Sequence, residues 1–352
     1  MTIPEPRPDL ALREGYHSAQ VDVPVRLNTN ESPLPPPPEW TERLAEEVRA
    51  VRFNRYPDRD ALGLREALAG FHGVDAGQVF CANGSNEVLQ SICLAYGGAG
   101  RSAAVFEPTY ALHAHIAHLT GTAVVEGGRR DDFTLDPHQV ADLLGAHRPA
   151  ITFLCSPNNP TGLAEDRATV AAIVEGAPGL VVVDEAYGQF SDWSALDLVE
   201  EGRPLVVVRT FSKTWSMAAA RLGYAVAPAP LVEALRRVAL PYHLDSVKQA
   251  AGRLALEYAG EMEQRVAQVV RERERISAAM AAMAITVWPS QANFVLFRPE
   301  RRKAAEVWEG LVERGVLVRD TSGWPGLAGC LRVTVGTPGE NDAFLAALGE
   351  LV

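Results

Sequence analysis

The stretch PLVVVRTFSK, from Pro204 to Lys213, decides the fold class of this chain. Its apolar run from Leu205 to Val208 has no alternation with polar residues, which is typical of a strand buried on both faces. The stretch GLVVVDEAY, from Gly179 to Tyr187, has the same form. Strands buried on both faces belong to sheets with helices on either side, so these two stretches predict an α/β fold.

Outward from these stretches, short apolar runs alternate with helical stretches up to about residue 240. Four more strands are expected in QVFCANGSNE, SAAVFEPTY, TAVVEGG and AITFLCSPNNPTG. Such alternation predicts a mostly parallel sheet, and ligands of parallel sheets bind beyond the carboxyl ends of the strands. The polar tails NGSNE, EPTY, SPNNPTG, DEAY and TFSK all fall at those ends.

The pattern changes beyond about residue 240. A long helical stretch, broken near Gly260, is followed by the strand-like stretches ITVWPSQANFVLF, GVLVRD and CLRVTVG. This order predicts a smaller α+β domain. The first 40 residues are proline-rich, and the run from Pro35 to Pro38 excludes a helix there. We therefore predict an N-terminal arm (1–38), a large domain (39–240) and a small domain (241–352).

Composition narrows the function classes. Of the 352 residues 47% are hydrophobic and 22% charged, as in ordinary globular proteins. The net charge of −11 argues against a nucleic-acid partner. The N-terminus lacks the basic and apolar regions of a signal peptide, and no apolar run approaches the roughly 20 residues of a membrane helix. We expect a cytoplasmic protein with no nucleic-acid or membrane partner.

The four cysteines and the histidines give no metal-binding pattern. The cysteines are far apart and mostly lie inside apolar runs, so reduced, buried thiols are expected; they are Cys81, Cys93, Cys155 and Cys330. His115 and His118 lie one helical turn apart, but no carboxylate has matching spacing. We expect an ordinary helix there and no metal.

Lys213 is an unusual choice of residue for this chain. Only Lys213, Lys248 and Lys303 are lysines, which leaves thirty arginines among the 33 cationic residues. Lysine, unlike arginine, can lose its proton and attack a carbonyl. Chance placement of three lysines explains Lys213 equally well when that residue is considered alone.

The other strand tails carry polar or aromatic residues with two interpretations each. Ser85 and Asn86 open a helix, where they could bind a phosphate or merely cap the helix. Tyr110 could stack on a planar ring or lie in the core. Asn159, in SPNNPTG, could contact a ligand or belong to a plain turn.

Asp184 ends a buried strand, where a carboxylate is costly unless it is paired. Its partner could be a protonated heterocycle nitrogen or simply an arginine, and Tyr187 could reach the same ligand.

The hydroxyls and guanidinium of Thr210, Ser212 and Arg221 could form a second phosphate clamp, or could serve as caps, turns and a surface residue. One ligand satisfies all these groups together, because pyridoxal 5′-phosphate has a phosphate, a planar ring, a ring nitrogen, a phenolic oxygen and an aldehyde.

The chain resembles the fold-type I PLP-dependent aminotransferases. The resemblance rests on the stretches LNTNESP, NRYPD, NGSNE, FEPTY, SPNNPTG, VVVDEAY, TFSKTWSMAAARLGY, LPYHL, ANFVLF, VRD and CLRVTVGTPGEND. It implies a seven-stranded, mostly parallel sheet between helices, a small α+β domain to which the arm contributes, and a homodimer. It also implies transamination between histidinol phosphate and 2-oxoglutarate in histidine biosynthesis. An aromatic amino acid aminotransferase and a threonine-phosphate decarboxylase remain the alternatives.

The resemblance also implies a role for each site residue. Lys213 would attach to the cofactor and later move the proton. Asp184 would pair with the ring nitrogen, and Tyr110 would stack on the ring. Asn159 and Tyr187 would hydrogen-bond the phenolic oxygen. The phosphate would be held by Ser85, Asn86, Thr210, Ser212 and Arg221.

Four further residues are expected at the edge of the site. Tyr56 would reach the cofactor phosphate of the partner subunit. The anionic end of the substrate would meet Tyr16, Arg319 and Arg332, and the arm would contribute to the substrate site through Tyr16. The sequence departs from the family at Asn86, where many relatives have Asp, and at Ser32, where Asn is common.

Overall fold

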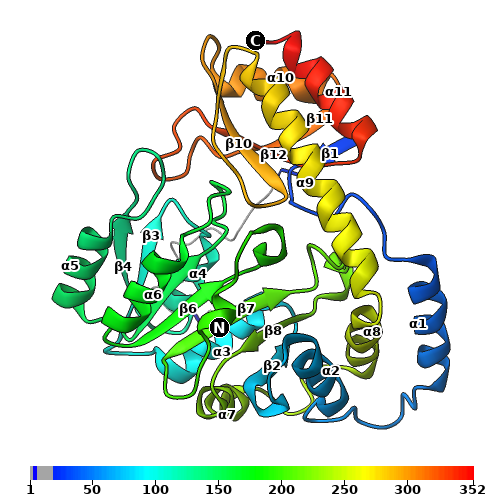
Figure 1. Cartoon of the computed structure of the whole chain (residues 1–352), viewed down its shortest axis with the longest axis vertical. Helices are drawn as coiled ribbons and strands as arrows, with labels where there is room; N and C mark the ends of the chain where they lie inside the picture. Colours follow the sequence, from blue (N-terminus) through cyan, green and yellow to red (C-terminus); the bar gives the residue numbers. More distant parts are fainter. Residues whose placement is uncertain (1–2, 6–18) are drawn as a thin grey trace.

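The computed structural model describes residues 3–5 and 19–352, and every structural statement below concerns this part of the chain. The described residues form two sheets, a seven-stranded one in the lower half of Figure 1 and a five-stranded one in the upper half. The long helix α9 (Ala259–Ala281) runs from one half to the other.

The large sheet has the strand order β2-β8-β7-β6-β5-β3-β4. Its strands are β2 (Val79–Ala82), β3 (Ser102–Glu107), β4 (Ala123–Gly128), β5 (Ile151–Cys155), β6 (Leu180–Asp184), β7 (Leu205–Thr210) and β8 (Gly223–Val226). Neighbouring strands from β4 to β7 are parallel, whereas β8 runs antiparallel to both of its neighbours. The predicted α/β class and the mostly parallel sheet are confirmed.

Alternate residues of β7 explain why its sequence is apolar throughout. Val206 and Val208 belong to a cluster with helices on one face of the sheet, and Leu205 and Val207 belong to a cluster on the other face. The first face is covered by α3 (Ser85–Tyr96), α4 (Leu112–Leu119) and α7 (Ala229–Val238). The second is covered by α5 (Pro137–His147), α6 (Arg167–Gly176) and, towards β2, α2 (Leu62–His72) and α8 (Ser246–Leu256).

The small sheet has the strand order β1-β11-β12-β10-β9. Its strands are β1 (Val25–Leu27), β9 (Ile285–Val287), β10 (Phe294–Pro299), β11 (Val316–Asp320) and β12 (Leu331–Thr334). It packs on α9, α10 (Ala304–Glu313) and α11 (Pro338–Gly349) around a core of its own. Strand β1 pairs in parallel with β11, so the N-terminal segment completes this sheet.

Helix α1 (Pro38–Ala50) begins within the proline run, with Pro38 in its first turn. The exclusion of a helix from Pro35 to Pro38 therefore fails at its last residue, because the first turn needs no N–H donor from proline. The domain boundaries at 38/39 and 240/241 stay a prediction. None of the helices in the described ranges is long and apolar enough to cross a membrane.

Candidate active site

A cavity of about 200 Å³ lies at the carboxyl ends of the large-sheet strands and reaches the small sheet. Eleven of the predicted site residues line it: Ser85, Asn86, Tyr110, Asn159, Asp184, Tyr187, Thr210, Ser212, Lys213, Arg221 and Arg332. Thr29, Asn30, Cys155 and Ala186 complete the lining. Five separate strand ends and one strand of the small sheet therefore converge on one hollow.

Asp184 ends β6 and is 1% exposed, yet its partner is not an arginine. Its Oδ2 lies 3.0 Å from Nε2 of His113, and its Oδ1 accepts a hydrogen bond of 3.0 Å from the backbone N–H of Ala186. The neighbouring residue Glu185 takes the arginine instead, since Nη2 of Arg209 lies 2.6 Å from its Oε2. The carboxylate that faces the cavity is thus the one without an arginine.

Lys213 follows β7, and its amine donates a 3.2 Å hydrogen bond to the backbone carbonyl of Thr29. Burial, together with the positive charges of Arg332 and Arg221, lowers the pKa of Lys213 to about 7, although Glu31 acts in the opposite direction. About half of an amine with this pKa is neutral at pH 7, and the neutral form is nucleophilic.

The start of helix α3 forms an open cradle beside Lys213. Its N-cap residue is Gly84, with φ near +81°, and no side chain caps the helix. The interpretation of Ser85 and Asn86 as ordinary caps is therefore wrong. A Cβ atom on Gly223 would lie 2.3 Å from the backbone nitrogen of Ser85, so strand β8 approaches closely. The free N–H groups and the positive end of a 12-residue helix favour an anion here.

Hydroxyl and guanidinium groups line the opposite side of this cradle. Thr210 Oγ1 donates to Ser212 Oγ at 3.0 Å, and Nη1 of Arg221 donates to the same Ser212 oxygen at 3.1 Å. Together with the start of α3, these groups provide the donor set that a phosphate group needs.

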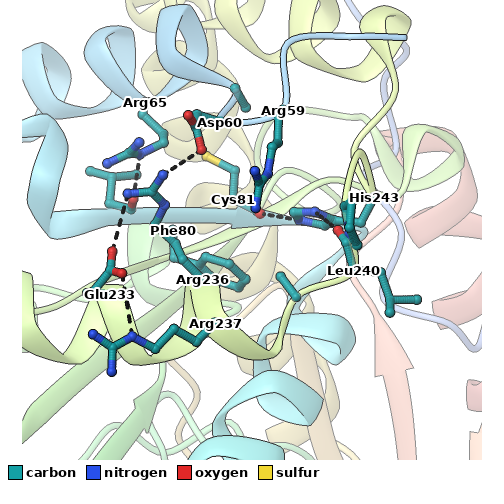
Figure 2. Close-up of a pocket in the computed structure, with 14 residues that line it drawn as sticks. Arg59, Asp60, Arg65, Phe80, Cys81, Glu233, Arg236, Arg237, Leu240 and His243 are labelled. Carbon is teal, nitrogen blue, oxygen red and sulfur yellow. Dashed lines mark hydrogen bonds and ion pairs between the residues drawn. The ribbon is translucent and has the colours of Figure 1, made fainter.

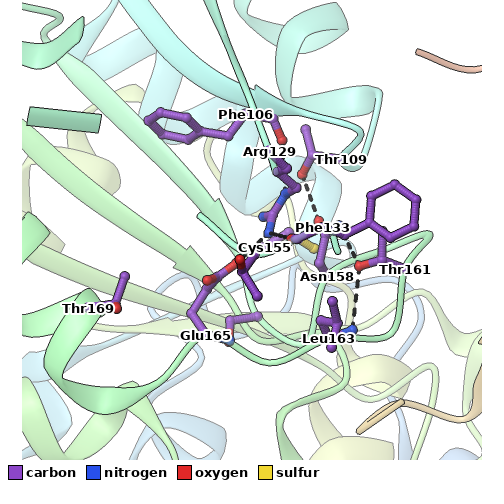
Figure 3. Close-up of polar contacts among 12 residues, drawn as sticks. Phe106, Thr109, Arg129, Phe133, Cys155, Asn158, Thr161, Leu163, Glu165 and Thr169 are labelled. Carbon is purple, nitrogen blue, oxygen red and sulfur yellow. Dashed lines mark hydrogen bonds and ion pairs between the residues drawn. The ribbon is translucent and has the colours of Figure 1, made fainter. Parts of the chain in front are cut away.

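Asn159 is held in place by a buried polar network behind its loop, part of which Figure 3 shows. The amide nitrogen of Asn158 donates to the Pro108 carbonyl at 3.0 Å and to Thr161 Oγ1 at 2.9 Å. Thr109 Oγ1 donates back to the Asn158 oxygen at 3.0 Å. This network fixes the loop that carries Asn159 to the loop that follows β3.

An ion pair between Arg129 and Glu165 lies next to this network (Figure 3). Both side chains are buried, and the Glu165 backbone N–H donates to Ser156 Oγ at 2.9 Å. The loop that carries Asn159 is therefore anchored at both ends.

Two of the predicted residues that the structure describes do not line the cavity. Tyr56 is 80% exposed and stacks on Tyr242, with ring centroids 4.5 Å apart. Arg319 lies opposite Arg332 in the β11–β12 ladder, and its guanidinium lies 5.6 Å from the ring centroid of Trp324. Tyr16 falls outside the described residues.

A larger cavity, of about 360 Å³, lies between the loop that follows Tyr56 and helix α7 (Figure 2). It contains none of the predicted site residues. Its arginines are partly neutralised, since Arg236 contacts Asp60 at 2.5 Å and Glu233 at 3.4 Å. Among its lining residues no nucleophile is paired with a base, and the Cys81 thiol is buried with a pKa raised to about 12. Volume alone therefore does not identify the active site.

His113 and Asn30 were missed by sequence reasoning. His113 is fully buried and stacks on Phe153, with centroids 4.9 Å apart. Its only local signal is that it lies in the first turn of α4, the helix that begins two residues after Tyr110. Asn30, in the stretch LNTNESP, donates to the Tyr187 hydroxyl at 2.9 Å. Among the described residues no group of three His, Cys, Asp or Glu side chains could hold a metal.

Residues 22–348 match the family described as aminotransferase class I and II, and the chain belongs to this family. Two relatives are both named histidinol-phosphate aminotransferase. The protein of Frankia casuarinae is 48% identical over 95% of this chain and 87% of its own length. That of Mycobacterium marinum is 45% identical over 99% of this chain and 95% of its own length.

A solved structure supports the fold. The histidinol-phosphate aminotransferase of Sinorhizobium meliloti, in complex with pyridoxal 5′-phosphate, superposes with a TM-score of 0.86. It is 23% identical, and the match covers 94% of this chain and 90% of that one. The expected aminotransferase family and fold are confirmed.

Proposed function

We propose that this chain transfers an amino group between histidinol phosphate and 2-oxoglutarate in histidine biosynthesis, giving imidazole-acetol phosphate and glutamate. The observation that carries the proposal is the meeting of Lys213 and Asp184 in one cavity beside the open start of α3. Relatives 45–48% identical over nearly the whole chain bear the name of this reaction, and they support the choice of substrate.

The lining of the cavity fits pyridoxal 5′-phosphate. The uncapped start of α3, with Ser85, Asn86, Thr210, Ser212 and Arg221, would hold the phosphate. Asp184 would face the ring nitrogen, Tyr110 would stack on the ring, and Asn159 and Tyr187 would face the phenolic oxygen. Lys213 would hold this cofactor before the amino donor arrives, and the cofactor would then withdraw electrons from the substrate's Cα.

Lys213 has the properties of the proton carrier. Its neutral amine can take the proton from the substrate's Cα and return it to a neighbouring carbon. Arg332 and Arg221 keep that amine neutral through their charge, as does its burial. His113 holds the Asp184 carboxylate at 3.0 Å, so the negative charge stays fixed at the end of β6.

Arg332 is the group best placed to bind the anionic end of the substrate. It is 2% exposed, lines the cavity, and donates to the Asn159 side-chain oxygen and, at 3.0 Å, to the Asn28 carbonyl. Arg319 and Tyr16 would complete this anion site. Burial strengthens the pairing of a guanidinium with a carboxylate or phosphate.

The protein would act as a homodimer in the cytoplasm. Tyr56 does not line the cavity of its own chain; it is exposed and stacks on Tyr242, and Phe53 and Leu240, close to these two in the sequence, are exposed as well. Exposed aromatic side chains at one site are typical of a protein interface. Tyr56 would then contact the cofactor phosphate in the partner subunit.

A half-reaction screen tests the substrate. The PLP-loaded protein is mixed in turn with histidinol phosphate, phenylalanine, tyrosine, glutamate and threonine phosphate, and the decay of the visible absorption band is followed. Histidinol phosphate and glutamate should bleach the band fastest. Faster bleaching by phenylalanine or tyrosine would favour the aromatic alternative, and release of CO₂ from threonine phosphate would favour the decarboxylase.

A hybrid experiment tests the shared site. Inactive Tyr56→Ala and Lys213→Ala proteins are mixed under conditions that allow subunits to exchange. One wild-type site per mixed dimer should restore part of the activity. Absence of recovery, in a mixture shown by mass to contain hybrids, would contradict the role of Tyr56.

A further inference from the structure

Tyr187 has a buried hydrogen-bond partner that belongs to neither the large sheet nor its loops. The side-chain amide nitrogen of Asn30 lies 2.9 Å from the Tyr187 hydroxyl oxygen. Asn30 is 1% exposed and Tyr187 is 5% exposed. Asn30 has a positive φ of 55°, and its backbone carbonyl accepts a 3.2 Å hydrogen bond from the side chain of Asn293.

The orientation of the Asn30 amide follows from the hydroxyl of Thr334. Thr334 Oγ1 accepts the backbone N–H of Asn30 at 2.9 Å and lies 3.1 Å from the Asn30 side-chain oxygen. Thr334 Oγ1 donates its single hydrogen to the Asn30 side-chain oxygen, which can only accept, while one of its lone pairs receives the Asn30 N–H. The NH₂ end of the amide must then face Tyr187.

This orientation determines where the Tyr187 proton points. An NH₂ group only donates, so it occupies a lone pair of the tyrosine oxygen and cannot receive the tyrosine hydrogen. Burial raises the pKa of Tyr187, so the hydroxyl keeps its proton. Tyr187 lines the cavity, and its O–H is thus free to donate to a group bound there.

The side-chain amide of Asn159 is oriented in a similar way, by a residue of the same strand as Thr334, β12. Arg332 donates to the Asn159 side-chain oxygen, which leaves the Asn159 NH₂ group available to the cavity. Arg332 and Thr334 are two residues apart on β12, so they lie on the same face of the small sheet. The direction in which Tyr187 and Asn159 donate is therefore set by residues on one face of β12.

We infer that Asn30, held by Thr334, is a positioning residue that makes Tyr187 a hydrogen-bond donor to an anionic oxygen on the ring of the bound ligand. The inference rests on the proposed function, in which that oxygen is the phenolic oxygen of pyridoxal 5′-phosphate. A donor to an anionic oxygen favours the deprotonated form of the chromophore, so loss of the donor raises the pH at which the chromophore titrates.

The test is a pH titration of the visible band of PLP-loaded Asn30→Asp. A carboxylate keeps the size of the side chain but accepts the Tyr187 proton and turns it away from the cavity. The midpoint should rise by about one pH unit or more, because one unit corresponds to about 1.4 kcal/mol, which the loss of a hydrogen bond to a charged group exceeds. An unchanged midpoint would overturn the inference.

The introduced carboxylate also adds a charge, and a double-mutant cycle separates the two effects. In a Tyr187→Phe background there is no proton to reorient, so Asn30→Asp should add little to the shift that Tyr187→Phe causes alone. Additive shifts would mean that the carboxylate introduced by Asn30→Asp acts through its charge, and the inference would fail.

Two variants of Thr334 serve if Asn30→Asp does not fold. Thr334→Val removes the hydroxyl at nearly constant volume and should raise the midpoint by a smaller amount, because the amide is then free to turn. Thr334→Ser keeps the hydroxyl and should titrate like the wild type. Identical midpoints for valine and serine would overturn the inference.

A buried asparagine away from the cavity is the matched control. Asn341 is fully buried and donates to Glu272 and to the Gly336 carbonyl. Asn341→Asp should lower the thermal midpoint of unfolding without moving the titration; a shift as large as that of Asn30→Asp would contradict a specific role. A wild-type protein that binds no PLP would instead refute the proposed function itself.

Discussion

The two sheets contribute to the cavity in different ways. The large sheet supplies side chains from the loops that follow its parallel strands, such as Asp184 after β6 and Lys213 after β7. The small sheet supplies Arg332 from within β12, and Thr334 of the same strand holds Asn30, which also lines the cavity. In the proposed function the loop residues carry the groups that react, whereas the strand residues orient two neighbouring side chains, Asn159 directly and Tyr187 through Asn30.

Lys213→Ala is expected to give the largest effect, because it removes the residue that we propose as the proton carrier. Transamination should fall by about 10⁴-fold or more, and PLP should dissociate on dialysis. Steady-state turnover and the visible spectrum measure the two effects. Lys303→Ala, at an exposed position before α10, is the control and should retain activity. Comparable losses in the two variants would contradict the assignment.

The lowered pKa of Lys213 predicts unusual reactivity in the cofactor-free protein. With a pKa of about 7, roughly half of this amine is neutral at pH 7, whereas an ordinary lysine with a pKa near 10.4 is neutral in about 4 molecules in 10⁴. An amine-acylating reagent should therefore label Lys213 about 10³ times faster than an ordinary lysine.

Mass spectrometry of samples labelled across a pH series gives the midpoint. Labelling of Lys213 should rise as pH increases through 7, since only the neutral amine reacts. Arg332→Gln removes a positive charge and should move the midpoint upward. A wild-type midpoint near 10 would show that burial and Arg332 do not act on Lys213 in this way.

Substituting Arg332 and Arg319 tests how the small sheet contributes to substrate binding. Arg332→Gln should lower kcat/KM about a hundredfold, mostly through KM, because truncating one member of a buried charge pair costs about 2–5 kcal/mol. Arg319→Gln should cost about tenfold, since its guanidinium does not line the cavity. Equal losses for the two variants would contradict this ranking, and a loss confined to kcat would contradict a binding role for Arg332.

Asn158→Ala tests the structural support behind the large-sheet loops. It removes three hydrogen bonds of a fully buried side chain and should lower the free energy of unfolding by about 2 kcal/mol. Activity of the folded protein should fall less than tenfold. Denaturant unfolding and kcat/KM, measured on one preparation, give the change in stability and the change in activity. Unchanged stability would mean that the network is not needed to hold the loop.

The sequence predicted the large-sheet part of the site because carboxyl ends of parallel strands meet at one edge. Each polar tail there could be recognised from its own apolar run, as for Asp184 after LVVV. The same reasoning missed β8, since GYAV is short, contains glycine and runs antiparallel. Its presence in a seven-stranded sheet was expected from the family resemblance alone.

The small-sheet part had no comparable local signal. Nothing in the stretch CLRVTVG distinguishes a strand residue that reaches a cavity from one that packs in a core, and Arg332 was proposed only from the resemblance. Asn30 and Thr334 are 304 residues apart, so their pairing is a property of the folded chain. His113 was missed for the same reason, because its partner Asp184 is 71 residues away.

The pairing of β1 with β11 also sets an order of assembly during synthesis. All seven strands of the large sheet lie between Val79 and Val226, so they can pair before the rest of the chain leaves the ribosome. Strand β1 is synthesised early, but its partner β11 follows about 290 residues later. At 5–20 residues per second, the delay between the two strands is roughly 15–60 s. Asn30 therefore finds Thr334 only when translation is almost finished, so this side of the cavity is completed late, with only α11 still to follow.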